Sequence, residues 1–233
     1  MYKTIVIKKT AITILFFLIE LNLLYSQEYN RKTIFGVNAG CSLPYAEFAA
    51  RTMTSYAGFA SPGMNMEIDL LGYLNRFFGL TTGIGYASFF FREKAYQAEY
   101  DRILAGYGEN TVSAGNYQVL TGVLGFILKI PETSHTEALI VCRMGIAMSV
   151  HPDLVVTNSK LGEINTVSKN SDWNLAGNMG LKVHYWLTEK YGISFNYSLN
   201  FTGPDFRDDT GLGKSFFLPV RYMNINAGFV MNL

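Results

Sequence analysis

The sequence predicts an all-β fold: an eight-stranded antiparallel up-and-down transmembrane β-barrel, preceded by a signal peptide. Three observations predict it: repeated alternation of apolar and polar residues, connections that are alternately long and short, and few charges. Of the 233 residues, 49% are hydrophobic, 15% are aromatic and 16% are charged. About 25% charged residues is usual for a soluble domain. No linker or repeat divides the chain, so we expect one large β domain.

Residues 1–26 have the features of a secretory signal peptide. These features are a positively charged start, an apolar stretch and a small residue before the cut, at Lys3, Lys8 and Lys9, at 11–25, and at Ser26. An uncleaved membrane helix is the alternative, but a spanning helix needs about 20 apolar residues, and Glu20 interrupts this stretch. We therefore divide the chain into a signal peptide, 1–26, and an outer-membrane β-barrel domain, 27–233.

The rest of the chain excludes two classes of protein. It has no second run of about 20 apolar residues, which excludes helical membrane spans after the leader. The formal net charge of the whole chain is +1, and no basic patch suggests a nucleic-acid partner. A chain of this kind can cross a bilayer only as a closed barrel, because open strands would leave backbone groups unpaired in hydrocarbon.

Alternation with a period of two, the mark of a β-strand with one buried face, is clearest over 191–202. Its odd positions are aromatic or aliphatic, whereas its even positions are Gly, Ser, Asn and Thr. Similar segments predict eight strands, at 33–44, 62–72, 77–91, 116–130, 137–151, 171–187, 191–203 and 216–233. Segment 116–130 has apolar residues on both faces, and we assign its even positions to the outside.

The connections between these strands alternate in length. The long connections are 45–61, 92–115, 152–170 and 204–215, and the short ones are 73–76, 131–136 and 188–190. Transmembrane barrels have short periplasmic turns, longer external loops and an even number of strands. The pattern therefore predicts that both mature termini are periplasmic.

Alternation alone fits either a soluble lipocalin-like barrel with an apolar interior or a membrane barrel with an apolar exterior. A solvated exterior would carry many Lys and Glu side chains, but the polar face here is mostly Gly, Ser, Asn and Thr. Small polar groups suit the narrow lumen of an eight-stranded barrel. Aromatic residues near strand ends are expected to form two interfacial girdles; they are Phe78, Tyr86, Trp173, Tyr191 and Phe217.

Short motifs at both ends of the barrel domain add a resemblance. In the final strand, alternate positions are apolar (Ile225, Ala227, Phe229, Met231 and Leu233), and Asn224, Asn226, Gly228 and Asn232 lie between them. Residues 35–40 read Phe-Gly-Val-Asn-Ala-Gly. With the leader ending Tyr-Ser-Gln over 25–27, the chain resembles outer membrane β-barrel domain proteins of the Bacteroidetes type, including porin-like and PorT-like members. The resemblance implies an outer-membrane location and a barrel fold, and it implies no defined activity.

Charged residues on the polar faces are expected to meet in the lumen. Glu67 and Asp69 lie two apart on one strand face, as a pair of carboxylates for acid–base chemistry could. The structural interpretation is a lumen charge network with Arg143 and Lys182, and with Lys129 as a further candidate, because buried charges need partners. A functional version of the same network would be a gate or a proton-sensitive plug.

The cysteines and histidines do not predict a metal or cofactor site. Cys41 and Cys142 share faces with apolar residues on strands across the barrel from each other, so we expect two free thiols that point to lipid. His135, His151 and His184 fall in a turn, at an outer strand end and in the lumen, and they do not converge. A serine–histidine–acid triad stays open, although no nucleophile-elbow motif marks one.

The long connection 92–115 is the best candidate for binding. It carries charged residues among tyrosines, and its first part, 93–104, is expected to form a short helix. A solvated, variable loop is one interpretation, and a contact surface on a rigid scaffold is the other. The candidate binding residues are Arg92, Tyr96, Tyr100, Arg102 and Tyr107.

The function we expect is non-enzymatic, with a structural or loop-mediated binding role in the outer membrane and a packed lumen. The expected partners are outer-membrane lipid, the barrel assembly machinery and an extracellular or periplasmic protein. Three alternatives remain open: a narrow porin-like channel, a secretion-system accessory barrel, and a lipid-modifying enzyme that would use Ser194 or His184.

Overall fold

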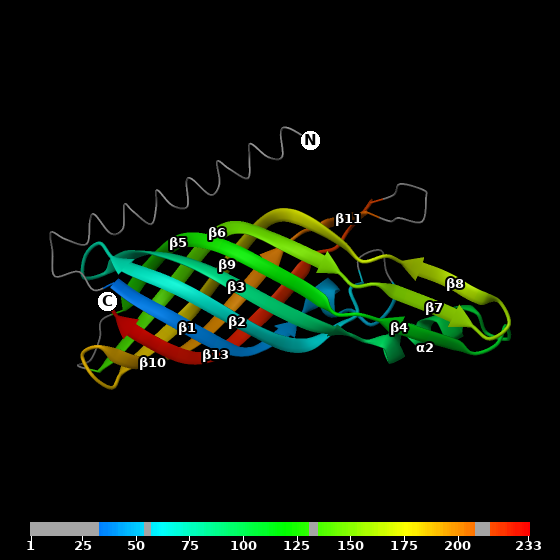
Figure 1. The fold of residues 1–233 in the computed structure, drawn as a ribbon, viewed down its shortest axis with the longest axis horizontal. Coiled ribbons are helices and arrows are strands. Elements are labelled where there is room, and N and C mark those ends of the chain that lie inside the picture. Colours follow the sequence, from blue (N-terminus) through cyan, green and yellow to red (C-terminus); the bar gives the residue numbers. More distant parts are fainter. Residues whose placement is uncertain (1–32, 54–56, 131–134, 208–214) are drawn as a thin grey trace.

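Eight long strands close into an antiparallel barrel in the computed structural model of the protein (Figure 1). The structure describes residues 33–53, 57–130, 135–207 and 215–233. The predicted signal peptide, 1–26, lies outside the described residues. Each barrel strand pairs with the strands before and after it in the chain, and β1 pairs with β13 to close the ring. The predicted up-and-down topology is therefore confirmed.

The barrel strands lie close to the eight predicted segments. They are β1 (Thr33–Pro44), β2 (Ala60–Tyr73), β3 (Phe78–Phe91), β5 (Tyr117–Ile130), β6 (Thr136–His151), β9 (Asn170–Trp186), β10 (Tyr191–Thr202) and β13 (Val220–Asn232). The predicted last segment is too long, because it is divided in two around Pro219, which has no backbone N–H for the ladder. Its first part is β12 (Ser215–Phe217), which pairs with β11 (Asp205–Arg207) rather than with the barrel. Phe217 therefore lies outside the barrel wall.

The long connections contain the short helix predicted over 93–104 and also strands that the alternation did not predict. Between β3 and β5 lie α2 (Glu93–Ile103) and β4 (Asn110–Ala114), and between β6 and β9 lie β7 (Leu154–Asn158) and β8 (Gly162–Val167). β4 and β8 each pair with β7 in a separate three-stranded sheet. This sheet and α2 form an extension beyond the end of the barrel opposite the C-terminus (Figure 1). A further turn, η1 (Ala46–Ala49), follows β1. No helix in the described part of the chain is long and apolar enough to span a membrane.

The wall has an apolar exterior and a largely polar interior, as in a transmembrane barrel and unlike a lipocalin. Leu175 and Phe229 on the outside are 76% and 74% exposed. In β5 the even positions Leu124 and Phe126 are exposed, and the odd position Val123 is buried, as predicted. Trp173 and Tyr191 are exposed near the beginning of β9 and β10, and because these strands are antiparallel the two residues lie toward opposite ends of the barrel, where girdle residues are expected.

The interior is arranged in three layers. An aromatic-rich apolar cluster fills the end near the extension; it includes Phe48, Phe89, Tyr117, Phe206 and Tyr222. A second apolar cluster lies toward the other end; it includes Ile34, Leu71, Ile127, Leu139 and Val230. Buried polar and charged side chains occupy the wall between them. The lumen is therefore filled with side chains, as expected for eight strands.

The predicted free thiols can be tested directly. Cys41 on β1 and Cys142 on β6 are unpaired and exposed on the outer face, and three strands separate β1 from β6 on either side of the ring. We expect no intramolecular disulfide on a non-reducing gel, because bonded cysteines need Cα atoms within about 7 Å. We also expect both thiols of the membrane-embedded protein to react with an apolar maleimide far faster than with a charged one. An oxidised monomer, or equal reaction with both reagents, would contradict this placement.

Candidate functional site

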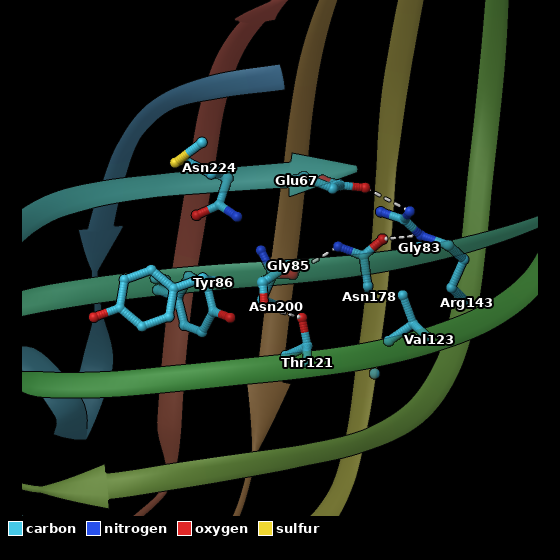
Figure 2. Close-up of a pocket in the computed structure, with 14 residues that line it drawn as sticks. Glu67, Gly83, Gly85, Tyr86, Thr121, Val123, Arg143, Asn178, Asn200 and Asn224 are labelled. Carbon is cyan, nitrogen blue, oxygen red and sulfur yellow. Dashed lines mark hydrogen bonds and ion pairs between the residues drawn. The ribbon is translucent and has the colours of Figure 1, made fainter. Parts of the chain in front are cut away.

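The first ion pair of the lumen joins two predicted residues on strands that are far apart in sequence. Arg143 Nη1 lies 2.5 Å from Glu67 Oε1, and Arg143 Nε donates a hydrogen bond of 2.8 Å to Asn178 Oδ1. The Glu67 carboxylate also accepts a hydrogen bond of 3.3 Å from Asn196. A cavity of about 20 Å³ lies beside this pair (Figure 2). That volume holds one or two water molecules.

The second ion pair joins the other two predicted residues. Lys182 Nζ lies 2.5 Å from Asp69 Oδ2, and both side chains are buried. The same Asp69 oxygen accepts a hydrogen bond of 2.9 Å from Asn38 Nδ2. Gly36 leaves room for the Asp69 carboxylate, since a Cβ at that position would lie 2.8 Å from Asp69 Oδ1. The structure thus places all four residues of the predicted network in the lumen, as two ion pairs.

A third group lies toward the short-turn end and was missed by the sequence analysis. Glu137 bonds Lys129 Nζ at 2.9 Å and His184 Nδ1 at 3.1 Å. Lys129 therefore pairs with Glu137 rather than with Glu67 or Asp69. Glu137 is the second residue of its strand and pairs in register with His184. That cross-strand register is the signal that could have found it, but it is visible only once the strands are aligned.

These pairs make the lumen electrostatically balanced. A buried charge without a partner costs several kcal/mol, so each carboxylate in this narrow space needs its own cation. Each of the three lumen acids has one, and the hydrogen bonds from the asparagines satisfy further oxygen atoms. For Glu67 and Glu137, the structural interpretation therefore accounts for their positions without an acid–base reaction.

The three histidines lie in separate places. His135 is exposed beside the turn after β5, and His184 is buried at the Glu137 pair. His151 packs edge-on against Phe206 and Phe216 in the aromatic-rich cluster. Within the described ranges, no group of His, Cys, Asp and Glu side chains could hold a metal ion.

Three of the five candidate binding residues instead hold the extension in place. The Tyr96 ring lies edge-on against Phe59, 4.9 Å between centroids, and its burial raises the pKa of the Tyr96 phenol. Tyr100 accepts a hydrogen bond of 2.8 Å from Asn165 on β8. Arg92 donates to the Ala49 carbonyl at 3.4 Å. These side chains join α2 to the barrel mouth and to the small sheet.

A chain of hydrogen bonds through two buried asparagines fixes the outer part of the extension. Asn158 donates to Asn110 at 2.9 Å, and Asn110 donates to Asp101 at 2.7 Å. Asn158 also caps its own turn by accepting from the backbone N–H groups of Lys160 and Leu161. Both asparagines are almost fully buried. The extension is therefore a rigid element rather than a solvated loop.

The other two candidates, Arg102 and Tyr107, are exposed at the outer part of the extension. Tyr107 is 58% exposed, and Ile103 and Leu161, which the sequence analysis missed, are 54% and 53% exposed. The segments that carry them meet, since the Ser159 N–H donates to the Glu109 carbonyl at 2.9 Å. We call Ile103, Tyr107 and Leu161 the apolar tip. Three large apolar side chains held in water by a rigid support are typical of a contact surface.

Arg102 borders the apolar tip and is paired with an acid. Its guanidinium lies 3.0 Å from the carboxylate of Glu99. This hydrogen bond and one from the Met53 backbone N–H lower the pKa of the Glu99 carboxyl. The opposite charges of the pair leave this edge of the tip with little net charge.

No protein family and no curated protein matches this sequence. Several solved structures are similar in fold. The attachment invasion locus protein Ail of Yersinia pestis matches with a TM-score of 0.44 and 10% identity over 86% of this chain and 97% of Ail. Neisserial surface protein A matches with a TM-score of 0.42 and 12% identity over 86% and 97%. A major outer membrane protein of Thermus thermophilus matches with a TM-score of 0.46 and 12% identity over 86% and 99%.

The Glu67–Arg143 pair gives a prediction for stability. Arg143→Met leaves the Glu67 carboxylate buried without its cation, so we expect a loss of about 3–5 kcal/mol in the free energy of unfolding. Urea titration of the protein folded into lipid vesicles measures it. The double variant Glu67→Gln/Arg143→Met removes both charges and should recover most of the loss. A single variant as stable as the wild type would show that the pair contributes little.

Proposed function

We propose that this protein is a non-enzymatic outer-membrane barrel that displays a rigid extracellular contact surface, the apolar tip. The observation that carries the proposal is the construction of the extension. Hydrogen bonds of two buried asparagines and an aromatic contact hold it, yet its outer apolar side chains contact water. Exposed apolar groups cost free energy in a monomer, so a rigid support for them is best explained by a partner.

The apolar outer wall supports the outer-membrane location. Backbone groups of the wall are paired around a closed ring, which a bilayer requires of any spanning structure. The alternation of short turns and long connections supports periplasmic termini, with the extension on the cell surface. The signal peptide over 1–26 and the Bacteroidetes-type resemblance, porin-like or PorT-like, belong to the same proposal. Barrel assembly machinery would insert such a chain.

The filled lumen opposes the alternative functions of a channel and of an enzyme. A cavity with room for one or two waters, with an apolar cluster of buried side chains on either side of it along the described barrel, opposes the passage of a solute. Ser194 and His184, the candidates for lipid chemistry, are both fully buried in the lumen. Neither side chain can reach a lipid outside the wall. No observation singles out a secretion-system role.

Cell fractionation with heat-modifiable gel mobility and surface proteolysis tests location and topology together. We expect an outer-membrane band that shifts on boiling, because closed barrels resist detergent until they are heated. In intact cells, protease should cut the long connections only, whereas the turn 131–136 should be cut only after the membrane is opened. A soluble periplasmic protein without a heat shift would overturn the proposal.

Site-specific photo-crosslinking on native cells tests the contact surface. A photoreactive side chain at Tyr107 or Leu161 should give one discrete adduct, because these positions would be covered by the partner. The matched control is Ser113, which is exposed on β4 of the same extension and pairs with Val155, toward the other end of the small sheet from the turn that carries Leu161. Adducts equally at all three positions, or at none, would contradict a specific surface at the tip.

A further inference from the structure

Four lumen side chains from four different strands converge in a way that the ion pair alone does not require. Lys182 comes from β9, Asp69 from β2, Asn38 from β1 and Ser194 from β10. Each of the four is at most 1% exposed. Among them are an amine, a carboxylate, a carboxamide and a hydroxyl group, which are the groups needed for transfer of an acyl group between nitrogen atoms.

A single oxygen atom brings the amine and the carboxamide together. Asp69 Oδ2 lies 2.5 Å from Lys182 Nζ and accepts a hydrogen bond of 2.9 Å from Asn38 Nδ2. A carboxylate placed between two nitrogen atoms can take a proton from one and give a proton to the other. Asp69 is therefore positioned to relay a proton from the lysine to the amide nitrogen of Asn38.

The other end of the same carboxamide also has a partner. The Ser194 hydroxyl donates a hydrogen bond to Asn38 Oδ1. A donor on this oxygen polarises the carbonyl group and stabilises the negative charge that develops when a nucleophile adds to its carbon. The Asn38 carboxamide therefore accepts a hydrogen bond at its oxygen and donates one from its nitrogen. Both hydrogen bonds favour attack of a nucleophile at Cγ.

We propose that Lys182 and Asn38 form an intramolecular amide bond, with release of ammonia. Proton transfer from Lys182 Nζ to Asp69 gives a neutral amine, which adds to Asn38 Cγ while Ser194 holds the oxyanion. A second proton passes from Nζ through Asp69 to the Asn38 nitrogen, and the bond from Cγ to that nitrogen breaks. One amine and one primary amide become one secondary amide and one ammonia, and nothing is oxidised or reduced.

The folded lumen supplies the conditions for this reaction. When the fold holds two reacting groups side by side, their effective concentration can reach about 10⁵ M or more, which raises the rate of reaction between them. When the bond has formed, Asp69 has lost its cation and keeps a proton, so no unpaired charge remains in the lumen.

The bond would staple the barrel across its interior. In the ring, β13 and β10 lie between β1 and β9, so the link would join strands that share no backbone hydrogen bonds. It would cross-link residues 38 and 182 and enclose most of the barrel in one covalent loop. A loop of this kind restricts the unfolded chain more than the folded one.

Mass spectrometry of the full-length protein purified from membranes tests the proposal. After proteolysis, the peptides that contain Asn38 and Lys182 should appear as one branched species, lighter than the two separate peptides together by one ammonia. Lys182→Arg keeps a cation beside Asp69 but removes the nucleophile, so it should give two separate, unmodified peptides. Asn38→Ser is a second control, which removes the acyl carbon if Lys182→Arg fails to fold.

Two further readouts separate a reaction from a chance modification. Ser194→Ala removes the oxyanion donor, so the branched peptide should form on the order of 100-fold more slowly after synthesis. After boiling, the cross-linked wild type should also migrate faster on a gel than boiled Lys182→Arg, because the cross-link makes its unfolded chain more compact. Separate Asn38 and Lys182 peptides of unmodified mass in the wild type would overturn the proposal and leave an ion pair only. Location and surface binding would stand in that case, because they depend on the wall and the extension.

Discussion

Closure of the ring is the constraint on which the rest of the structure depends. The pairing of β1 with β13 runs through eleven residue pairs, from Ile34–Asn232 to Pro44–Tyr222, and it removes the free edges that eight strands would otherwise have. In hydrocarbon each unpaired N–H or C=O group costs several kcal/mol, so an open sheet of the same strands would not be stable there. Closure also fixes which face is inside, because neighbouring side chains of a strand point in opposite directions.

The lumen follows from this closure. Eight strands enclose a space too narrow for a water-filled channel and too polar on its wall to be left empty, so most of the polar side chains that point inward bond each other. The small residues on the inner face make this possible. Gly83, for example, leaves room for Arg143, because a Cβ there would lie 2.9 Å from the guanidinium Nη1 atom. Charge balance in the lumen is therefore a result of packing as much as of electrostatics.

Sequence reasoning found the wall because one signal, the period of two, is strictly local. The period of two predicts the strands and their inward and outward faces. The faces in turn predict that both thiols are free and that Glu67, Asp69, Arg143 and Lys182 lie in the lumen. Interactions across the sequence were not accessible in the same way. The bond of Glu137 with His184 depends on register, and its residues lie 47 apart in the chain.

The extension shows the same limit more clearly. β4 and β7 form a ladder only because two separate connections meet above the barrel, and neither segment alternates strongly enough to predict a strand by itself. Tyr96 and Tyr100 looked like binding residues because aromatic side chains in a long loop are usually exposed. Their partners, Phe59 and Asn165, lie in other segments of the chain.

The ladder of β4 with β7 limits how the sequence of the extension can change in evolution. In most barrels each external loop can lengthen, shorten or be exchanged alone, because it depends only on the two strands that carry it. Here the connection after β3 and the connection after β6 are halves of one small sheet. An insertion in one of them would disrupt its pairing with the other. We therefore expect the two connections to change together, and single substitutions to be tolerated best in the turns, where they leave the ladder intact.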